Sequence, residues 1–413
     1  MSRKCAMVIL DGLGDLPVAG LGGKTPLEFA ATPVLDRLAG LGRYGLVDPI
    51  GRGVMPNTHS GCGVLLGVLP GDVGRLKRGP IEASGAGCSL QPGDIALRCN
   101  FATLESDAEG LRITDRRAGR IEEHTAELAA SFSHMDLGDS VSAQLHPTDQ
   151  HRCVLVLSGP GLSAQVSDTD PGDHAMPAYV GRCQPLSDEA GKTADKINLF
   201  IDRAHDLLSV HPVNRLRVHE GKLPATGIIT RGAGEEFRPE NLVRQNGLKA
   251  AVVAGCNTVI GLARKVGFET RTDARFTAAA DTDLQAKMTA VLELFGQHDL
   301  VYVHVKAPDL FSHDRQPENK SRFLECVDEA LEVLDQAGVM IVIAADHTTD
   351  SNSGSHTDDP IPALFYQPGR VAERPGQPVN FGESLCAGGN MPRQTSNSLL
   401  LTVLQAIKSA PAD

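Results

Sequence analysis

The chain is poor in aromatic side chains and contains no tryptophan. Phe, Tyr and Trp together make up 4% of its 413 residues. With 41% hydrophobic and 22% charged residues, the composition is still that of a globular protein. Its cores must therefore be built mainly from Ala, Val, Leu and Ile. A length of 413 residues exceeds what one simple core holds and predicts two domains.

Long apolar runs, closely paired cysteines and an excess of basic residues are also lacking. No stretch reaches the ~18 apolar residues that cross a membrane, and the run near the N-terminus is too short for a signal peptide. The nine cysteines form no Cys-x-x-Cys pair, which favours buried thiols in a reducing cytoplasm. The net charge of -12 argues against nucleic-acid binding. We expect a cytoplasmic protein with no membrane or nucleic-acid partner, and a homo-oligomer is left open.

Three continuous apolar runs end in acidic or imidazole side chains. These are residues 6–10 before Asp11, residues 300–305 before Asp309 and His313, and residues 339–345 before Asp346 and His347. Thr32 and Pro33 predict a capped helix start, and residues 319–336 have helical apolar spacing. This alternation predicts an α/β fold with a doubly wound, mostly parallel sheet, whose sites lie at the carboxyl ends of the strands.

The middle of the chain interrupts this pattern. Residues 152–157 predict a strand and residues 193–209 an amphipathic helix, separated by Gly-Pro and Pro-Gly turns. Because candidate metal ligands occur on both sides, we expect a smaller α/β domain inserted into the first. The expected metal-binding domain comprises residues 1–78 and 239–413, and the expected substrate-binding insert comprises residues 79–238.

The acidic and imidazole residues could together hold two divalent metal ions. Asp309 and His313 have a spacing that places them on one face of a helix, Asp346 and His347 are adjacent, and His356 follows in a polar loop. Such ligands suit Mn²⁺, with Zn²⁺, Co²⁺ and Mg²⁺ as alternatives. Each residue alone could instead cap a helix or bind a local carbonyl. The joint pattern favours a two-metal site for phosphoryl transfer.

Such a site needs a nucleophile. Residues 54–67 form a turn that enters a helix of small residues, and this turn carries the hydroxyls of Thr58 and Ser60. A hydroxyl at a helix N-terminus is favoured as an alkoxide by the helix dipole and by a metal. Either residue could instead be an N-cap. A starting helix would rotate Ser60 by about 200° from Thr58, so both can hardly face one metal.

Charged residues in the insert could bind a small anion. Arg116, Arg117 and Arg120 lie close together, and a guanidinium binds carboxylate or phosphate through two parallel hydrogen bonds. A solvated basic turn is the alternative. Asp168 and Asp170 could accept hydrogen bonds from substrate hydroxyls or could simply form a turn.

In the order of these motifs the chain resembles the alkaline phosphatase superfamily and, more narrowly, the archaeal-type cofactor-independent phosphoglycerate mutases. The similarity runs nearly end to end. The supporting stretches are residues 10–15, 24–28, 79–83, 93–103, 115–120, 167–171, 211–214 and 231–234. The resemblance implies one metal held by Asp11, Asp346, His347 and the nucleophile hydroxyl, and a second held by Asp309, His313 and His356.

The resemblance also implies an activity. A phosphorylated hydroxyl would carry the phosphoryl group between the neighbouring hydroxyls of glycerate, which interconverts 2- and 3-phosphoglycerate. His151, Arg152 and Arg231 would face the substrate from the insert, and Lys306 could neutralise the migrating group. The substrate would be a small phosphorylated or phosphonate carboxylic acid.

The nucleophile loop departs from the family. The usual segment reads Pro-Gly-Ser-Asp-Thr-Ala-His-Leu, and alignment on the proline puts Thr58 at the serine position and His59 at the aspartate position. Threonine serves as nucleophile in nucleotide pyrophosphatases and phosphonoacetate hydrolase of the same superfamily. We therefore expect Thr58, rather than Ser60, to be the nucleophile and a ligand of the first metal.

Two alternatives follow from this departure. One is a phosphohydrolase or phosphonate hydrolase in which water attacks phosphorylated Thr58. The other is a catalytically inactive protein that binds a phosphorylated metabolite. Competent ligands at all seven metal positions favour an enzyme, and an arginine-bearing insert that excludes water favours a mutase.

Overall fold

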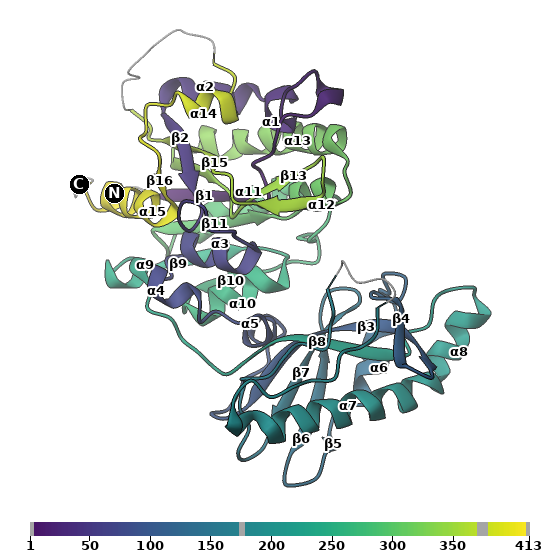
Figure 1. Cartoon of the computed structure of the whole chain (residues 1–413). Helices are drawn as coiled ribbons and strands as arrows, with labels where there is room; N and C mark the ends of the chain where they lie inside the picture. Colours follow the sequence, from purple (N-terminus) through teal and green to yellow (C-terminus); the bar gives the residue numbers. More distant parts are fainter. Residues whose placement is uncertain (1–3, 173–177, 370–378, 410–413) are drawn as a thin grey trace. The chain divides into compact units, whose positions relative to one another are not determined.

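The computed structural model describes residues 4–172, 178–369 and 379–409, and the chain divides into two compact units. Unit 1 comprises residues 1–74 and 239–413, and unit 2 comprises residues 75–238. Both are shown in Figure 1. The chain leaves unit 1 once and returns to it once, so unit 2 is an insertion between two segments of unit 1.

Unit 1 is built on an eight-stranded, mostly parallel sheet, which confirms the expected α/β class. β1 lies between β11 and β12 and is parallel to both, whereas β15 is antiparallel to its two neighbours. Every residue of β1, β11 and β12 is buried, which explains their continuous apolar sequences. In sheet order the strands are β10 (Glu269–Arg271), β9 (Ala250–Val253), β11 (Leu300–Val305), β1 (Cys5–Leu10), β12 (Met340–Ala344), β15 (Ile361–Tyr366), β2 (Arg43–Asp48) and β16 (Gln394–Thr395).

Two groups of helices accompany this sheet. α13 contacts α1, α2, α11 and α12, while α3 contacts α10 and α15. In Figure 1, α2 and α13 lie above β1 and β11, and α3 and α10 lie below them. The helices are α1 (Pro26–Phe29), α2 (Pro33–Leu41), α3 (Thr58–Leu65), α4 (Pro70–Val73), α9 (Leu242–Gln245), α10 (Asn257–Lys265), α11 (Leu284–Leu294), α12 (Ala307–His313), α13 (Pro317–Gln336), α14 (Glu383–Ala387) and α15 (Ser396–Lys408). A short hairpin of β13 (Thr348–Asp350) and β14 (Ser355–Thr357) follows β12, and the 3-10 turn η1 (Ala19–Leu21) follows β1.

The start of α2 is capped by another helix. Thr32 precedes α2 as predicted, but its side chain makes no capping hydrogen bond. The carboxylate of Asp328 on α13 instead accepts hydrogen bonds from the backbone N–H groups of Val34 and Leu35, at 3.0 and 2.7 Å. The predicted start of the helix is therefore confirmed, but the prediction that Thr32 caps it is wrong, because Asp328, distant in sequence, accepts from these N–H groups.

A buried ion pair fixes the loop that follows β1. Lys320 on α13 is fully buried, and its Nζ lies 2.7 Å from Asp15 Oδ2 and 2.7 Å from the carbonyl oxygen of Gly12. Asp15 also accepts hydrogen bonds from the backbone N and the Oγ of Ser351, at 2.9 and 2.6 Å. The pair thus joins the loop after β1 to the segment after β13.

We expect Lys320→Met to lower the free energy of unfolding by about 3–5 kcal/mol, because it leaves the Asp15 carboxylate buried without its cation. Chemical denaturation measures this. Arg322→Met is the matched control, because Arg322 lies on the same helix with an exposed side chain, and its effect should stay within about 0.5 kcal/mol. A loss below about 1 kcal/mol for Lys320→Met would contradict the assigned role.

Unit 2 has a sheet whose strand pairs are all antiparallel. The predicted strand and helix are confirmed as β7 and α7, and the apolar residues of α7 pack on the sheet together with Phe132, whose ring lies 5.5 Å from that of Phe200. The elements are α5 (Arg78–Gly85), β3 (Ile95–Asp107), β4 (Gly110–Asp115), α6 (Thr125–Ala130), β5 (Met135–Asp136), β6 (Ser142–Pro147), β7 (Arg152–Ser158), η2 (Asp188–Ala190), α7 (Gly191–Ser209), α8 (Pro212–His219) and β8 (Gly227–Gly234).

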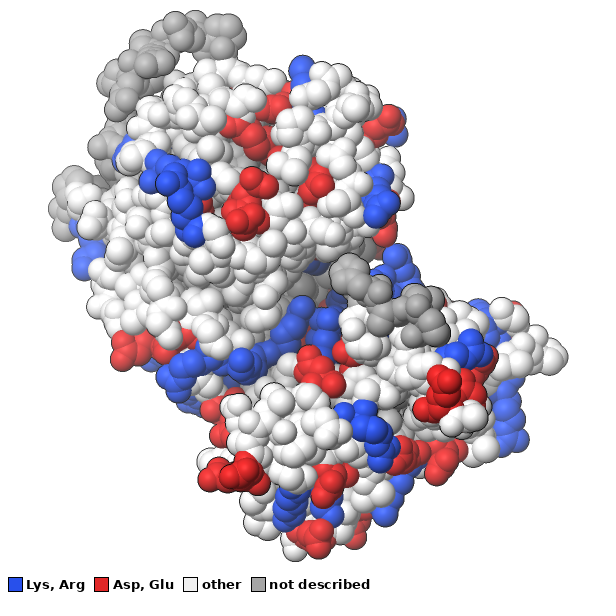
Figure 2. All heavy atoms as spheres, viewed as in Figure 1, with Lys and Arg blue, Asp and Glu red and all other residues white. Residues whose placement is uncertain are grey.

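The surface and the cysteines agree with the composition. On the face shown in Figure 2, acidic and basic side chains are intermixed over unit 2, at the lower right. Seven of the nine cysteines are buried, as expected. Within the described residues, no helix combines the length and the apolar character that crossing a membrane requires.

Candidate metal centre and arginine cluster

Three neighbouring strands bring the first site residues together. β11, β1 and β12 are adjacent and parallel, so the residues that follow them meet at one edge of the sheet. Asp11 follows β1, Lys306 follows β11, and Asp346 comes two residues after β12. The Lys306 Nζ donates to Asp11 Oδ1 at 2.9 Å, and the backbone N–H of Gly12 donates to Asp346 Oδ1 at 3.2 Å.

Asp11, Asp346 and His347 form a first group of potential metal ligands. All three are fully buried, and their ligand atoms lie within 4.8 Å of one another. His347 Nε2 lies 3.4 Å from Asp11 Oδ1 and 3.1 Å from Asp346 Oδ2. Two ligands of one metal ion are about 3.0–3.4 Å apart, since each lies about 2.1 Å from the ion. Within the described residues, Asp346 Oδ2 is buried and forms no hydrogen bond of good geometry, so this group fits a divalent ion.

A second group is formed by α12 and the β13–β14 hairpin. α12 carries Asp309 and His313, and the hairpin pairs Thr349 with His356. Asp309 Oδ1 lies 3.3 Å from His313 Nε2 and 3.5 Å from His356 Nε2, and the two histidine nitrogens are 3.2 Å apart. These distances also fit one divalent ion. The His347 and His356 rings stack with centroids 3.7 Å apart, so His347 lies close to both groups.

Lys306 stabilises the charged forms of Asp11 and Asp309, one carboxylate in each group. Its Nζ lies 2.9 Å from Asp11 Oδ1 and 2.6 Å from Asp309 Oδ2. Burial alone would raise the pKa of Asp11 and of Asp309, but the Lys306 ammonium and hydrogen bonds from histidines hold both pKa values well below the usual range. Burial opposes the charge of Lys306 as well, yet the two carboxylates raise its pKa. Both carboxylates are therefore anionic and suited to bind metal.

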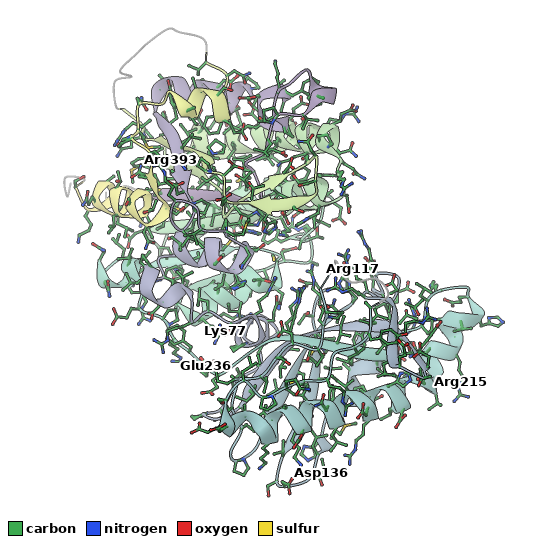
Figure 3. All side chains as sticks on the ribbon, viewed as in Figure 1. Lys77, Arg117, Asp136, Arg215, Glu236 and Arg393 are labelled. Atoms are coloured by element: carbon green, nitrogen blue, oxygen red, sulfur yellow. The ribbon has the colours of Figure 1, made fainter. Side chains whose placement is uncertain are left out.

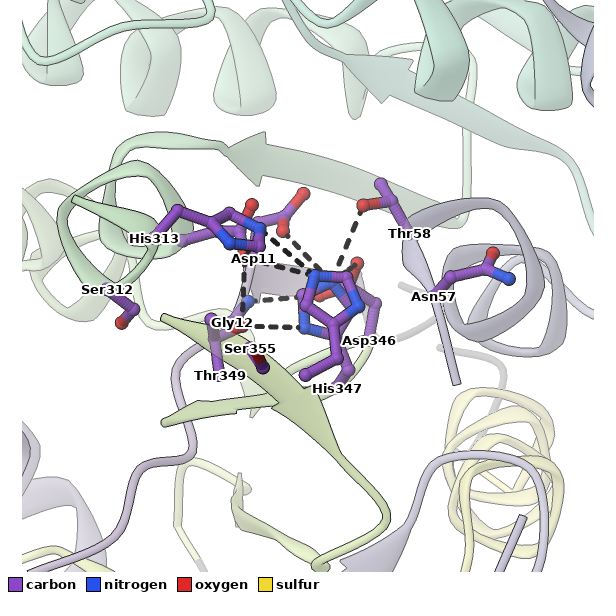
Figure 4. A network of polar contacts seen from close by, with 12 residues as sticks. Asp11, Gly12, Asn57, Thr58, Ser312, His313, Asp346, His347, Thr349 and Ser355 are labelled. Carbon is purple, nitrogen blue, oxygen red and sulfur yellow. Dashed lines mark hydrogen bonds and ion pairs between the residues drawn. The ribbon is translucent and has the colours of Figure 1, made fainter. Parts of the chain in front are cut away.

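The structure separates the two candidate nucleophiles. Thr58 is the first residue of α3, and Figure 4 shows it beside His347. Its Oγ1 lies 3.4 Å from His347 Nε2 and 3.3 Å from Lys306 Nζ. Asn57 is the N-cap, and Ser60 forms a capping box with it: Ser60 Oγ accepts from Asn57 N at 3.0 Å, and Ser60 N donates to Asn57 Oδ1 at 3.1 Å. The hydroxyl of Ser60 is thus engaged in capping α3, whereas that of Thr58 faces the metal ligands.

The small residues of α3 allow this approach. A Cβ at Gly61 would collide with the backbone carbonyl group of Asp346, so α3 packs directly on the main chain at the end of β12. This close packing places Thr58, one turn earlier, beside His347. The glycine in the segment is therefore explained by the position of the nucleophile candidate.

Unit 2 contains a cluster of arginines around Asp170. The guanidinium of Arg116 donates to both carboxylate oxygens of Asp170, each at 2.7 Å from Nη2, and Arg231 Nε lies 3.9 Å from the same carboxylate. Asp168 Oδ1 accepts from the backbone N of Gly232 at 2.8 Å. Asp170 therefore orients Arg116, and Asp168 fixes the backbone beside Arg231.

The cluster extends to Arg117, Arg120 and Arg152. Burial and then the neighbouring Arg120 lower the pKa of Arg117. Burial, followed by Arg152 and Arg117, lowers the pKa of His151 to about 3, so its imidazole is neutral at pH 7. Figure 3 shows Arg117 at one edge of unit 2 and Asp136 at the opposite edge.

Arg98 is a member of the cluster that the sequence did not reveal. It lies on β3 with 4% of its surface exposed, beside Arg78, Arg152 and Arg231. Burial and then Arg78 lower its pKa well below the ordinary value. The Nε atoms of Arg98 and Arg152 are buried and have no hydrogen-bond partner among the described residues. The one signal was a charged residue within an apolar strand sequence, Ile-Ala-Leu-Arg-Cys.

Comparison with known proteins decides the family. The 2,3-bisphosphoglycerate-independent phosphoglycerate mutase of Methanopyrus kandleri is 39% identical to this chain over 415 aligned residues, which cover 98% of the chain and 96% of the relative. The chain belongs to this family. The corresponding mutase 1 of Archaeoglobus fulgidus is 38% identical over 87% of the chain and 88% of the relative. The sequence profile of 2,3-bisphosphoglycerate-independent phosphoglycerate mutase matches residues 39–214.

Solved structures agree with this phosphoglycerate mutase assignment. A protein of Pyrococcus horikoshii superimposes with a TM-score of 0.80 and 29% identity, covering 100% of this chain and 99% of that protein. The cofactor-independent phosphoglycerate mutase of Thermoplasma acidophilum superimposes with a TM-score of 0.65 and 30% identity, covering 98% of this chain and all of that protein. The recognised family and the fold class are thereby confirmed.

Within this phosphoglycerate mutase fold, the predicted site residues fall into two sets. Thr58, Lys306 and the six other predicted metal ligands come together in unit 1, and the predicted arginines come together in unit 2. Sequence reasoning missed two buried residues that contact the metal-ligand groups. His304 Nε2 lies 2.9 Å from Asp11 Oδ2, and Thr349 Oγ1 lies 2.8 Å from Asp309 Oδ1. His304 lies within the apolar run 300–305, and Thr349 lies in the polar segment after His347, so neither position stood out in the sequence pattern.

Proposed function

We propose that the protein is a metal-dependent phosphoglycerate mutase that interconverts 2- and 3-phosphoglycerate through a phosphorylated Thr58. The main support is the position of the Thr58 hydroxyl, 3.4 Å from His347 Nε2 and 3.3 Å from Lys306 Nζ, in a chain of this family. One ion would be held by Asp11, Asp346, His347 and Thr58, and the other by Asp309, His313 and His356. Two bound divalent ions, with Mn²⁺ as the first candidate, would favour the alkoxide of Thr58 and offset phosphoryl charge.

The proposed reaction consists of two opposite transfers. Thr58 Oγ1 attacks the phosphorus of 3-phosphoglycerate, so that an Oγ1–P bond forms while the bond from phosphorus to substrate O3 breaks. The departing O3 retains the electron pair and gains a proton, and Thr58 loses one. The O2 hydroxyl of the same glycerate then attacks the phosphorus on Thr58 and loses its proton. The O2–P bond forms while the Oγ1–P bond breaks, and Thr58 Oγ1 keeps the electron pair and takes up a proton. No water is consumed, and every proton lost in one transfer is regained in the other.

Lys306 would assist both transfers without giving up its proton. Its Nζ lies within 3.3 Å of Thr58 Oγ1, and the neighbouring carboxylates keep it positively charged. A fixed ammonium group beside the reacting oxygen stabilises the negative charge of the phosphoryl group in the transition state.

The arginine cluster supports a substrate with a carboxylate and a phosphate. Among the described residues it brings together seven guanidinium groups and four carboxylates, and phosphoglycerate carries about three negative charges at pH 7. The residues are Arg78, Arg98, Arg116, Arg117, Arg120, Arg152 and Arg231, with Glu82, Asp115, Asp168 and Asp170. Bidentate hydrogen bonds from guanidinium groups would fix the orientation of such an anion.

Phosphorus NMR distinguishes this function from the alternatives. The Mn²⁺-loaded protein is incubated with 3-phosphoglycerate, the metal is removed, and the products are compared with those of chelator-treated protein. We expect 2-phosphoglycerate to form. Inorganic phosphate in its place would identify a hydrolase, and unchanged substrate would identify a binding protein. Either result would overturn the proposal.

We expect Arg98→Met to raise the KM for 3-phosphoglycerate about 10–100-fold, because a charge-assisted hydrogen bond contributes about 1.5–3 kcal/mol. The free energy of unfolding should not fall, because the substitution removes a charge that lies among other arginines. The carboxylate of Glu82 keeps its ion pair with Arg78 at 3.7 Å. Arg182→Met is the matched control, because Arg182 is exposed and pairs with Asp202. Steady-state kinetics with an unchanged KM for Arg98→Met would exclude Arg98 from substrate binding.

A further inference from the structure

Thr349 lies between the two groups of metal ligands. Its side chain is completely buried. Its Oγ1 lies 2.8 Å from Asp309 Oδ1 and 3.0 Å from His347 Nδ1. One hydroxyl therefore contacts a residue of each group, and Figure 4 shows Thr349 on the side of His347 away from Thr58.

These two contacts determine where the protons lie. A carboxylate can only accept, so the single proton of the Thr349 hydroxyl is donated to Asp309. Toward His347 the same oxygen can then only accept, so Nδ1 of His347 must carry a proton. The nitrogen left to bind a metal is Nε2, which lies 3.4 Å from Asp11 Oδ1 and 3.1 Å from Asp346 Oδ2.

The surrounding backbone leaves little freedom to this hydroxyl. Gly12 has a positive φ of 61°, and a Cβ there would lie 2.6 Å from Thr349 Oγ1 and 3.0 Å from the Asp309 Cα. Thr349 is also paired with His356 in the β13–β14 ladder. The loop after β1 and the hairpin thus confine the hydroxyl between His347 and Asp309.

We propose that Thr349 is a positioning residue that keeps the proton of His347 on Nδ1 and orients Asp309, and so prepares both groups for metal. The proposal rests on the metal dependence of the proposed function. A hydrogen-bonded neighbour that fixes the tautomer of a histidine ligand commonly contributes 10–100-fold to metal affinity. Because the Thr349 hydroxyl contacts a residue of each group, its loss should weaken the binding of both ions rather than of one.

The test compares substitutions that keep or remove the hydroxyl. Thr349→Val preserves the shape and removes both hydrogen bonds, Thr349→Ala removes them without placing a methyl group against Asp309, and Thr349→Ser keeps them. The matched control is Thr348→Val, because Thr348 is equally buried but donates to the carbonyl oxygens of Asp359 and Pro360. Calorimetric titration with Mn²⁺ measures affinity, and near-ultraviolet circular dichroism verifies the fold.

We expect Kd for Mn²⁺ to rise about 10–100-fold in Thr349→Val and Thr349→Ala, and to change less than about 3-fold in Thr349→Ser and Thr348→Val. A second measurement is ¹⁵N NMR of His347 in the Zn²⁺-loaded protein, which should show a protonated Nδ1 in the wild type and in Thr349→Ser. Unchanged affinity in folded Thr349→Ala, or an equal loss in Thr349→Ser, would overturn the proposal. A wild-type protein that binds no Mn²⁺ would instead overturn the proposed function together with it.

Discussion

Thr58→Ala should lower kcat by about 10⁴-fold or more, because it removes the atom that carries the phosphoryl group. The other ligands of the first group, Asp11, Asp346 and His347, remain in place, so bound metal should persist. Thr58→Ser should retain substantial turnover, since it preserves a hydroxyl at the same position. Mass spectrometry of acid-quenched wild-type enzyme should find phosphate on Thr58.

Ser60→Ala is the matched control for this experiment. It removes the capping box with Asn57 and should cost about 1 kcal/mol of stability, while kcat changes less than about 10-fold. Phosphate on Ser60, or full activity of Thr58→Ala, would show that the wrong hydroxyl has been assigned. Loss of metal in Thr58→Ala without loss of folding would show that Thr58 dominates metal binding.

The centre of unit 1 could be predicted because its chemistry is local in sequence. Buried parallel strands such as β1 and β11 are continuous apolar runs, and a site residue follows each one directly. The separation of Thr58 from Ser60 follows from the rotation of a helix, which the structure reproduces at the start of α3. In these places the local pattern and the final fold impose the same arrangement.

Contacts between distant segments could not be predicted in this way. Asp328 caps α2 from 294 residues away in place of Thr32, and Lys320 reaches the Gly12 carbonyl from α13. Arg98 lies in an apolar strand, where only the folded sheet of unit 2 reveals that other arginines surround it. These pairings depend on tertiary packing, on which residue spacing along the chain carries no information.

His347 lies close to both groups of metal ligands, so metal binding and turnover should depend strongly on it. Chelation should abolish activity, and Mn²⁺ should restore it. His347→Ala should remove most of the bound metal and lower kcat by about 10³-fold or more, because His347 Nε2 lies 3.4 Å from Asp11 Oδ1 and its ring stacks on His356. Elemental analysis of the purified variant measures the metal content.

His313→Ala separates the two groups. His313 contacts Asp309 and His356 but has 41% of its side chain exposed, at the outer side of the second group. The loss of His313 should therefore weaken the binding of the second ion and leave that of the first, giving about half of the wild-type metal content.

His219→Ala is the control, because His219 is exposed at the end of α8 in unit 2, and this variant should retain full metal content and activity. Equal metal content in His347→Ala and His219→Ala would exclude the ligand sets assigned to unit 1. Equal metal losses in His313→Ala and His347→Ala would contradict the assignment of His313 to the second ion alone.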